Sequence, residues 1–296
     1  MEYLLLMTLG PPAVALLLAI SIRFLTLRSA PRLGRRVALL TVAAGAIPTV
    51  IMTAPKLSYW IPSLRQSLTL SFQTITPLVL GILAVLLLMI PPRADHASAT
   101  AQLARRSVGS FVTVRWLWTL IALTAVIAAV SITAGAASSA DAGGQYTEYS
   151  FSVGSGLRIG TTIYGWHYSL PSFGVLAALL AVTVVAWLTI PLPAWHDDAR
   201  QDAAARRLRA ANIGRMTGGA LLVHLAAVLR SLAGTASLRG ETPTTELGTV
   251  FAGPPFAALE PVLECAGWIA LTAGLMMWIL TALTAIPSRH RATQTP

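Results

Sequence analysis

Residues 171–190 read PSFGVLAALLAVTVVAWLTI and contain no charged side chain. A helix of about 20 predominantly apolar residues is long enough to cross the hydrocarbon layer of a bilayer. Such a run is apolar all round the helix, whereas a helix on the surface of a soluble protein has one apolar stripe. The run therefore predicts a membrane span, and the rest of the chain can be compared with it.

Six further runs resemble this one, so the sequence predicts an all-α, polytopic transmembrane helical bundle of about seven spans. The spans are predicted at residues 3–22, 37–54, 68–90, 111–134, 171–190, 214–232 and 262–286. The weakest are 37–54, which contains Pro48, and 214–232, which contains His224 and Arg230. We treat residues 1–296 as a single transmembrane domain embedded in the lipid bilayer.

The composition agrees with this class. Hydrophobic residues make up 55% of the 296 residues and charged residues only 11%, against roughly 25% charged residues in a soluble domain. The net charge of +10 does not indicate nucleic-acid binding, because the arginines lie between the apolar runs. Cys265 is the single cysteine, so neither an intrachain disulfide nor a thiolate metal cluster can form. No cofactor or metal is expected.

The basic residues predict the orientation. Segments 23–36, 91–115, 191–215 and 287–296 hold 16 arginines, and the segments between them hold five basic residues. Loops on the cytoplasmic side of a membrane are enriched in Lys and Arg. We therefore expect a multi-pass protein of the plasma membrane with its N-terminus outside and its C-terminus in the cytoplasm.

Three parts of the sequence share one order: a double Arg, a span, an outer loop, a span, Ile-Pro and then His. The Ile-Pro pairs are Ile90-Pro91, Ile190-Pro191 and Ile286-Pro287. This order is expected of any helical hairpin, because proline ends a helix and arginine lies on the inner side. A hairpin repeated three times, as in transporter folds, is the second interpretation, and we leave it open.

The outer loop at residues 137–170 is predicted to contain a small extracytoplasmic β-hairpin around Gly154-Ser155-Gly156. Its aromatic side chains predict either a lid or docking surface, or an anchor at the membrane interface. We refer to five of these residues as the candidate outer cap: Tyr149, Phe151, Tyr164, Trp166 and His167. The second outer loop, 233–259, ends in Gly253-Pro254-Pro255 and is predicted to be irregular.

Residues 197–211 and, more briefly, 95–106 are predicted helices rich in Ala and Arg. They are expected either to lie along the inner membrane surface or to extend the spans into the cytoplasm. Two interpretations of their arginines remain: docking of a protein partner, or contact with anionic lipid.

Ionisable residues inside a span are expensive and are candidate functional residues. The last two spans carry four of them, which form the candidate intramembrane polar site: His224, Arg230, Glu260 and Glu264. Counting along the helices places His224 and Glu264 at similar depth. The four predict either a proton- or cation-responsive site or a structural ion pair. The third span adds a polar stripe, for helix packing or for a cavity: Ser67, Ser71, Thr74 and Pro77, with Gln73 beside it.

No phosphate-binding loop, HExxH or Gly-x-Ser-x-Gly motif occurs, so we expect no enzyme. The first functional hypothesis is a transporter or membrane permease subunit of unknown substrate. The alternative is a non-catalytic scaffold, sensor or assembly subunit that acts through a partner protein at the outer cap or at the Arg-rich helices. The first predicts a cavity between the second, third, sixth and seventh spans, and the second predicts a dry bundle.

Overall fold

Seven α-helices and two small β-sheets make up the computed structural model. It describes residues 2–25, 31, 33–57, 70–91, 109, 111–152, 158–191, 199–244 and 248–286. The helices are α1 (Glu2–Leu25), α2 (Arg35–Leu57), α3 (Leu70–Met89), α4 (Val114–Ala136), α5 (Trp166–Thr189), α6 (Ala199–Ala236) and α7 (Glu260–Leu283). The prediction of seven helices is confirmed, including the two with the weakest signal, and Pro48 does not interrupt α2.

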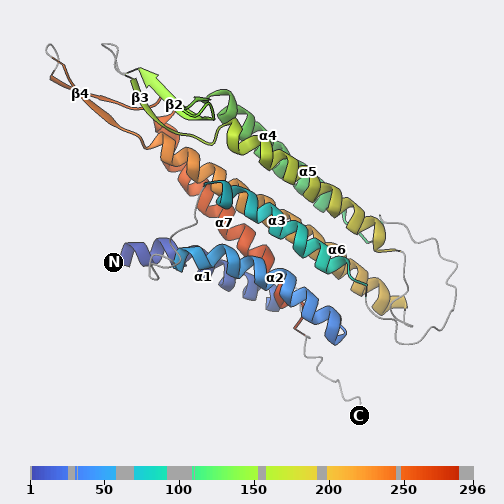
Figure 1. The fold of residues 1–296 in the computed structure, drawn as a ribbon. Helices are drawn as coiled ribbons and strands as arrows, with labels where there is room; N and C mark the ends of the chain where they lie inside the picture. Colours follow the sequence, from blue (N-terminus) through green and yellow to red (C-terminus); the bar gives the residue numbers. More distant parts are fainter. Residues whose placement is uncertain are drawn as a thin grey trace.

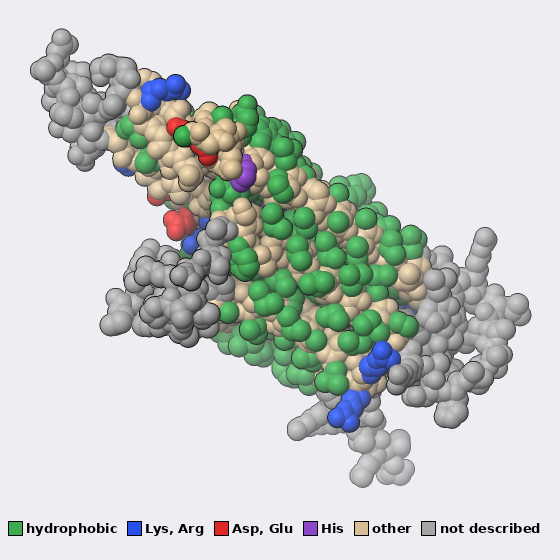
Figure 2. Space-filling view, in the orientation of Figure 1, with side chains coloured by type: hydrophobic (Ala, Val, Ile, Leu, Met, Phe, Trp, Pro, Cys, Tyr) green, Lys and Arg blue, Asp and Glu red, His purple; other side chains and the backbone are tan. Residues whose placement is uncertain are grey.

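Six of these helices, α2 to α7, are long and apolar enough to cross a membrane, and α1 is apolar over Leu9–Leu25. The side chains on the outside of the bundle agree with a position in a membrane. On the face shown in Figure 2, hydrophobic side chains cover the middle of the molecule, and charged side chains gather towards its two ends. The composition and the surface of the bundle are therefore those of a membrane protein.

Helix α6 is the centre of the bundle (Figure 1). Helices α3 and α7 pack along it, α4 and α5 lie against one side, and α1 and α2 are held mainly by α7 and α3. Fully buried side chains of α6 and α7, among them Met216, Leu221, Leu275 and Trp278, form much of the core. Helix α6 is thus enclosed by protein over most of its length.

Helix α6 has 38 residues, the most of any helix in the described part of the chain. At 1.5 Å per residue it is about 57 Å long, nearly twice the roughly 30 Å of a bilayer's hydrocarbon layer. The helix predicted at 197–211 is therefore an extension of the sixth span and not a separate surface helix, although residues 197 and 198 lie outside the described part. The shorter helix predicted at 95–106 also lies outside it.

The first sheet confirms the antiparallel strands predicted in loop 137–170. It consists of β1 (Ser139–Ala140), β2 (Tyr146–Ser152) and β3 (Arg158–Thr162), in that order, with Tyr149 opposite Thr161. The predicted turn at 154–156 lies outside the described residues. Between β1 and β2 the Asp141 carboxylate accepts hydrogen bonds from the backbone N–H groups of Gly143 and Gln145 and from the Thr147 hydroxyl.

The second loop, 233–259, is not irregular, and this prediction was wrong. Strands β4 (Gly240–Thr244) and β5 (Gly248–Ala252) pair antiparallel, with Thr242 opposite Val250. The prediction rested on Gly253-Pro254-Pro255, which follow β5. Pro243 lies within β4, where it is tolerated because proline occurs in edge strands and both strands of a two-stranded sheet are edges. Both sheets lie at the same end of the bundle in Figure 1, which we call the strand end. The opposite end, where α3, α5 and α7 finish, is the arginine end.

Candidate functional site

The candidate site is built around His224, which α6 places in the interior with no exposed surface. Its Nδ1 lies 2.7 Å from the backbone oxygen of Thr74 on α3. A carbonyl oxygen can only accept, so Nδ1 carries the proton and donates it. In the neutral ring Nε2 is then an acceptor, and it has no hydrogen-bond partner among the described residues. His224 therefore presents a buried, unused lone pair.

The Thr74 carbonyl that accepts from His224 lies in the turn of α3 that precedes Pro77. Pro77 has no backbone N–H, so the turn that precedes it lacks one helical hydrogen bond. Neighbouring side chains commonly bond to backbone groups near such prolines in membrane helices. The hydroxyl of Thr74 donates back to the carbonyl of Leu70. Within the described residues, which do not include Ser67, the polar stripe predicted on the third span thus serves hydrogen bonds within α3 and the bond from His224.

Three further polar side chains are buried at the strand end, and one of them, Tyr164, lies beside His224. The Tyr164 ring centroid lies 6.4 Å from that of His224 and 6.2 Å from that of Tyr168. The hydroxyls of Tyr164, Ser131 on α4 and Ser169 on α5 are buried, with no hydrogen-bond partner within the described ranges. Burial raises the pKa of Tyr164, and the hydroxyls of Ser172 and Ser131, close to it but outside hydrogen-bonding geometry, oppose that shift. We call His224, Tyr164, Ser131 and Ser169 the outer polar cluster.

The chemistry of the outer polar cluster is that of neutral hydrogen-bonding groups. It comprises three hydroxyls, which donate and accept, and one imidazole acceptor. Among the residues the structure describes, no group of three His, Cys, Asp or Glu side chains is placed to hold a metal ion. Buried polar atoms without partners are rare in native structures and mark places that need an explanation. The cluster is therefore a candidate functional feature.

The structure does not bring the four predicted residues of the last two spans together. Gly274 of α7 lies against Val223, and Gly267 lies against Arg230, so His224 is level with the residues beside Gly274 and not with Glu264. The expectation of one shared depth is wrong, because α6 continues to Ala236 before the chain turns. Within the described residues, no hydrogen bond or ion pair joins His224 to Glu264, which is exposed.

The other two residues have different partners. The Arg230 guanidinium lies 4.2 Å from the ring centroid of Trp268 on α7, a cation–π contact. Glu260 accepts a hydrogen bond from Arg239 at 3.0 Å in an ion pair near the surface. These contacts join α6 and α7 at the strand end, and only His224 of the four belongs to the buried cluster.

The five candidate cap residues also separate. Tyr149 packs against Phe256, with ring centroids 5.4 Å apart, and against Phe151, so these rings connect the first sheet to the segment after β5. Trp166 packs on Gly135 of α4, and His167 is exposed beside Tyr168. Tyr164 is not a cap residue: it is fully buried because it precedes α5 and points into the bundle, where it contacts His224.

Three arginines at the opposite end, Arg23 and Arg206 buried and Arg209 partly buried, form a feature that the sequence analysis missed. Arg206 donates to the carbonyl of Ile190 at 2.6 Å, Arg209 donates to that of Ile90 at 3.1 Å, and Arg23 donates to that of Ile286. Each acceptor is the isoleucine of an Ile-Pro pair. The last carbonyls of a helix have no intrahelical partner, and these three receive a guanidinium instead. We call Arg23, Arg206 and Arg209 the arginine belt.

Two arginines of the belt, Arg206 and Arg23, make further contacts that hold their side chains in place. Arg206 has no exposed surface, forms an ion pair with Asp202 at 2.8 Å and lies over the ring of Phe111 at 5.6 Å. Arg23 also donates from Nε to the carbonyl of Leu283 at 3.0 Å, near the end of α7. The signal in the sequence was the repeated Ile-Pro, but nothing in its spacing indicated which arginine each carbonyl would receive.

The helices expected to line a transport path, α2, α3, α6 and α7, pack closely through glycines that leave no room for a side chain. A Cβ atom added at Gly219 of α6 would lie 3.0 Å from the Gly274 carbonyl on α7, and one at Gly81 of α3 would lie 2.6 Å from the Ala220 methyl group on α6. At Gly45 of α2 it would collide with the carbonyl of Trp278. At these contacts α2, α3, α6 and α7 are closed against one another.

Comparison with protein-family models, with curated proteins and with solved structures finds no match to the chain.

Proposed function

We propose that this chain is a non-catalytic, multi-pass subunit of the plasma membrane that acts through a partner protein. The observation that supports this role is the glycine packing of α2, α3, α6 and α7. A solute path along these helices would require them to separate at Gly45, Gly81, Gly219 and Gly274. A sealed bundle is instead suited to holding surfaces in place on both sides of a membrane.

The proposed orientation puts the strand end outside and the arginine end in the cytoplasm. Cytoplasmic ends of spans are enriched in Arg, and Arg23, Arg206 and Arg209 gather where α3, α5 and α7 finish. The N-terminus is then outside and the C-terminus in the cytoplasm.

The partner is proposed to contact the strand end. Strand β3 pairs with β2 alone in the described part of the chain. The Thr162 carbonyl at its end accepts a hydrogen bond from Thr235 of α6, so the edge proposed for a partner is the part of β3 before Thr162. Exposed sheet edges accept an added strand from another protein. Tyr146 on β2 is half exposed and adds an aromatic contact at the same place.

Cysteine accessibility tests the sealed bundle. Ser131→Cys and Ser169→Cys are made in a Cys265→Ser background, and intact cells are treated with a membrane-impermeant thiol reagent. Both thiols are expected to remain unlabelled, because the parent hydroxyls are buried. Gln145→Cys, at an exposed position in the turn before β2, is the labelled control.

Labelling of Ser131→Cys or Ser169→Cys from outside would favour the second candidate function, a permease subunit. The observation behind that candidate is the outer polar cluster, whose unpartnered groups would line a path for small polar solutes. Protection of both thiols, with Gln145→Cys labelled, contradicts the permease.

Photo-cross-linking tests the partner. A benzophenone side chain at Tyr146 is expected to form one dominant protein adduct in native membranes. The same side chain at Val262, which is exposed on the flank of α7, should react with lipid and give no such adduct. Absence of a protein adduct at Tyr146 would contradict a partner at the strand end.

A further inference from the structure

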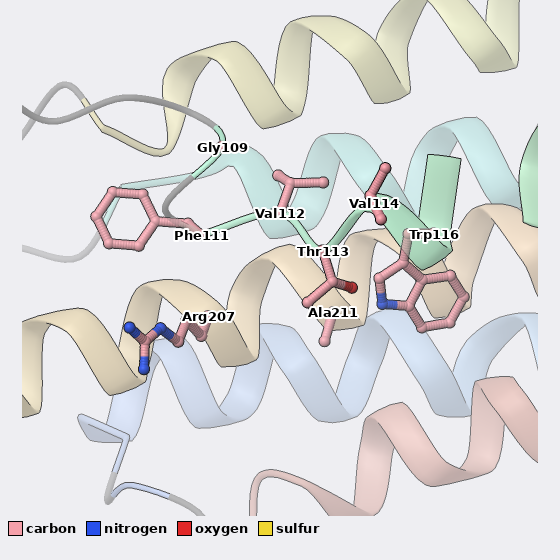
Figure 3. Close-up of a pocket in the computed structure, with 8 residues that line it drawn as sticks. All are labelled: Gly109, Phe111, Val112, Thr113, Val114, Trp116, Arg207 and Ala211. Atoms are coloured by element: carbon pink, nitrogen blue, oxygen red, sulfur yellow. The ribbon is translucent and has the colours of Figure 1, made fainter. Parts of the chain in front are cut away.

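A cavity of about 230 Å³ lies at the arginine end, between α6 and the chain that leads into α4 (Figure 3). Phe111, Val112 and Thr113 precede α4, Trp116 lies in its first turn, and Arg207 and Ala211 come from α6. The volume is smaller than the roughly 300–1,000 Å³ of pockets for drug-sized molecules. It suits a group the size of a lipid head group.

Arg207 is the charged residue of this cavity. Arg206 and Arg209, its neighbours on α6, are used by the carbonyls of Ile190 and Ile90. Arg207 is exposed and makes no hydrogen bond or ion pair with the described residues. In Figure 3 it lies on the Phe111 side of the cavity, with Trp116 at the opposite side. A full positive charge is therefore available to a ligand.

The start of α4 adds to this positive character. Thr113 caps the helix in an extended conformation without a side-chain hydrogen bond to the first turn. The N–H groups of a first helical turn have no intrahelical acceptor, and the helix dipole is positive there. Among the described residues, no acidic side chain lines the cavity. Its lining is thus complementary to an anion.

One edge of the cavity continues into an apolar surface. Val114 lines the cavity and is also 63% exposed. Leu117 and Trp118, three and four residues further along α4, are 46% and 66% exposed, and this spacing puts the three on one helix face. A ligand held at Arg207 would therefore have an apolar surface beside it that runs towards the middle of the bundle.

We propose that this cavity binds the phosphate of an anionic phospholipid from the cytoplasmic leaflet, with an acyl chain lying along Val114, Leu117 and Trp118. Basic pockets between spans on the cytoplasmic side are known binding places for such head groups. The proposal rests on the membrane embedding and orientation proposed above, but not on the partner at the strand end.

The test measures lipid binding to the purified full chain by native mass spectrometry, with phosphatidylglycerol and phosphatidylcholine as probes. Phosphatidylglycerol is expected to bind more tightly. Arg207→Gln should weaken phosphatidylglycerol about tenfold, because it removes a charge-assisted hydrogen bond, and should leave phosphatidylcholine unchanged. Arg207 is exposed, so the unfolding temperature of the variant should match that of the parent.

Arg36→Gln is the matched control. Arg36 lies at the start of α2, is exposed, and does not line the cavity, so its loss should change phosphatidylglycerol binding less than twofold. Equal weakening by both variants would mean non-specific attraction to the basic surface and would overturn the proposal. Equal binding of both lipids would overturn it too.

A soluble anion separates the lipid from free phosphate. If glycerol 3-phosphate bound as tightly as phosphatidylglycerol, the apolar face of α4 would contribute nothing and the lipid proposal would fail. A failure of the lipid proposal in any of these measurements would not alter the labelling of Ser131→Cys or the adduct at Tyr146. The lipid site and the proposed function are therefore tested separately.

Discussion

At the arginine end, three guanidinium groups, two buried and one partly buried, each reach the carbonyl of an Ile-Pro pair, and Arg206 also has its own carboxylate partner. At the strand end, the His224 nitrogen and three hydroxyls are buried without hydrogen-bond partners among the described residues. Buried charges are usually retained only when paired, and the arginine belt follows that rule. Buried polar groups left without partners lower the stability of the fold. The polar side chains of the outer polar cluster are therefore not accounted for by a contribution to stability.

The largest effect is expected from breaking the arginine belt. Arg206→Leu leaves the Asp202 carboxylate and the Ile190 carbonyl buried without their partner. Removing one member of a buried ion pair costs about 3–5 kcal/mol. The free energy of unfolding, measured by denaturant titration in detergent micelles, should fall by that amount.

The double variant Asp202→Leu/Arg206→Leu is the control for this prediction. It removes both charges, so it should be more stable than Arg206→Leu alone. Arg207→Leu, on the exposed side of the same helix turn, should change the free energy of unfolding by less than about 0.5 kcal/mol. If Arg206→Leu behaved like Arg207→Leu, the contrast between the two ends would disappear.

A smaller effect of opposite sign is expected at the outer polar cluster. Tyr164→Phe removes a buried hydroxyl that has no partner in the described part of the chain and keeps the ring that packs on His224. Because an unsatisfied buried polar group costs about 1–3 kcal/mol, the variant should be as stable as the parent or up to about 1 kcal/mol more stable. The same denaturant titration measures it, and a loss above about 1 kcal/mol would show that the hydroxyl has a partner.

The smallest effect is a pH dependence confined to the turn before β2. Hydrogen bonds from Gln145, Thr147 and Gly143 hold the pKa of Asp141 below its ordinary value of 3.8. A carboxyl whose folded pKa is lowered stabilises the turn above its unfolded pKa, and that contribution is lost as the pH falls through the folded value. Hydrogen exchange of the Gly143 and Gln145 amides, corrected for intrinsic rates, should therefore lose protection only at strongly acidic pH.

Asp141→Ala should remove this protection at every pH, because neither amide keeps its acceptor. Protection that stayed constant in the parent protein while the Asp141 carboxyl became protonated would contradict the role of the carboxylate. The helices should be unaffected by either change.

The sequence predicted the helices well because a span is a local property, an apolar run of about 20 residues. It predicted the first hairpin from β-prone residues around Gly154–Gly156, but it missed β4 and β5, because Gly253-Pro254-Pro255 at the end of the loop indicated an irregular segment. The failure was one of local propensity, which pairing between strands overrides.

For the candidate site, prediction from the sequence failed for a different reason, because the contacts depend on tertiary structure. His224 was identified because an ionisable residue inside a span is rare, yet its partner is the Thr74 backbone carbonyl, which has no sequence signature. Glu264 was assigned by counting residues along helices whose ends were misplaced, and the true register follows from Gly267 against Arg230. The meaning of the three Ile-Pro pairs also required the tertiary structure, since Arg23 lies more than 250 residues from the carbonyl it reaches.

Helix α6 has a consequence for how the chain enters the membrane during synthesis. Of the six helices apolar enough to cross, it has the lowest mean hydropathy and the largest buried share. Such a segment gains little from lipid alone, so the insertion machinery has to hold it until earlier helices offer it a protein surface. Helix α3 precedes it in the chain and α7 follows, so α6 is enclosed on both sides only after α7 has been synthesised. The order of synthesis therefore makes the arrival of α7 the step that completes the enclosure of α6.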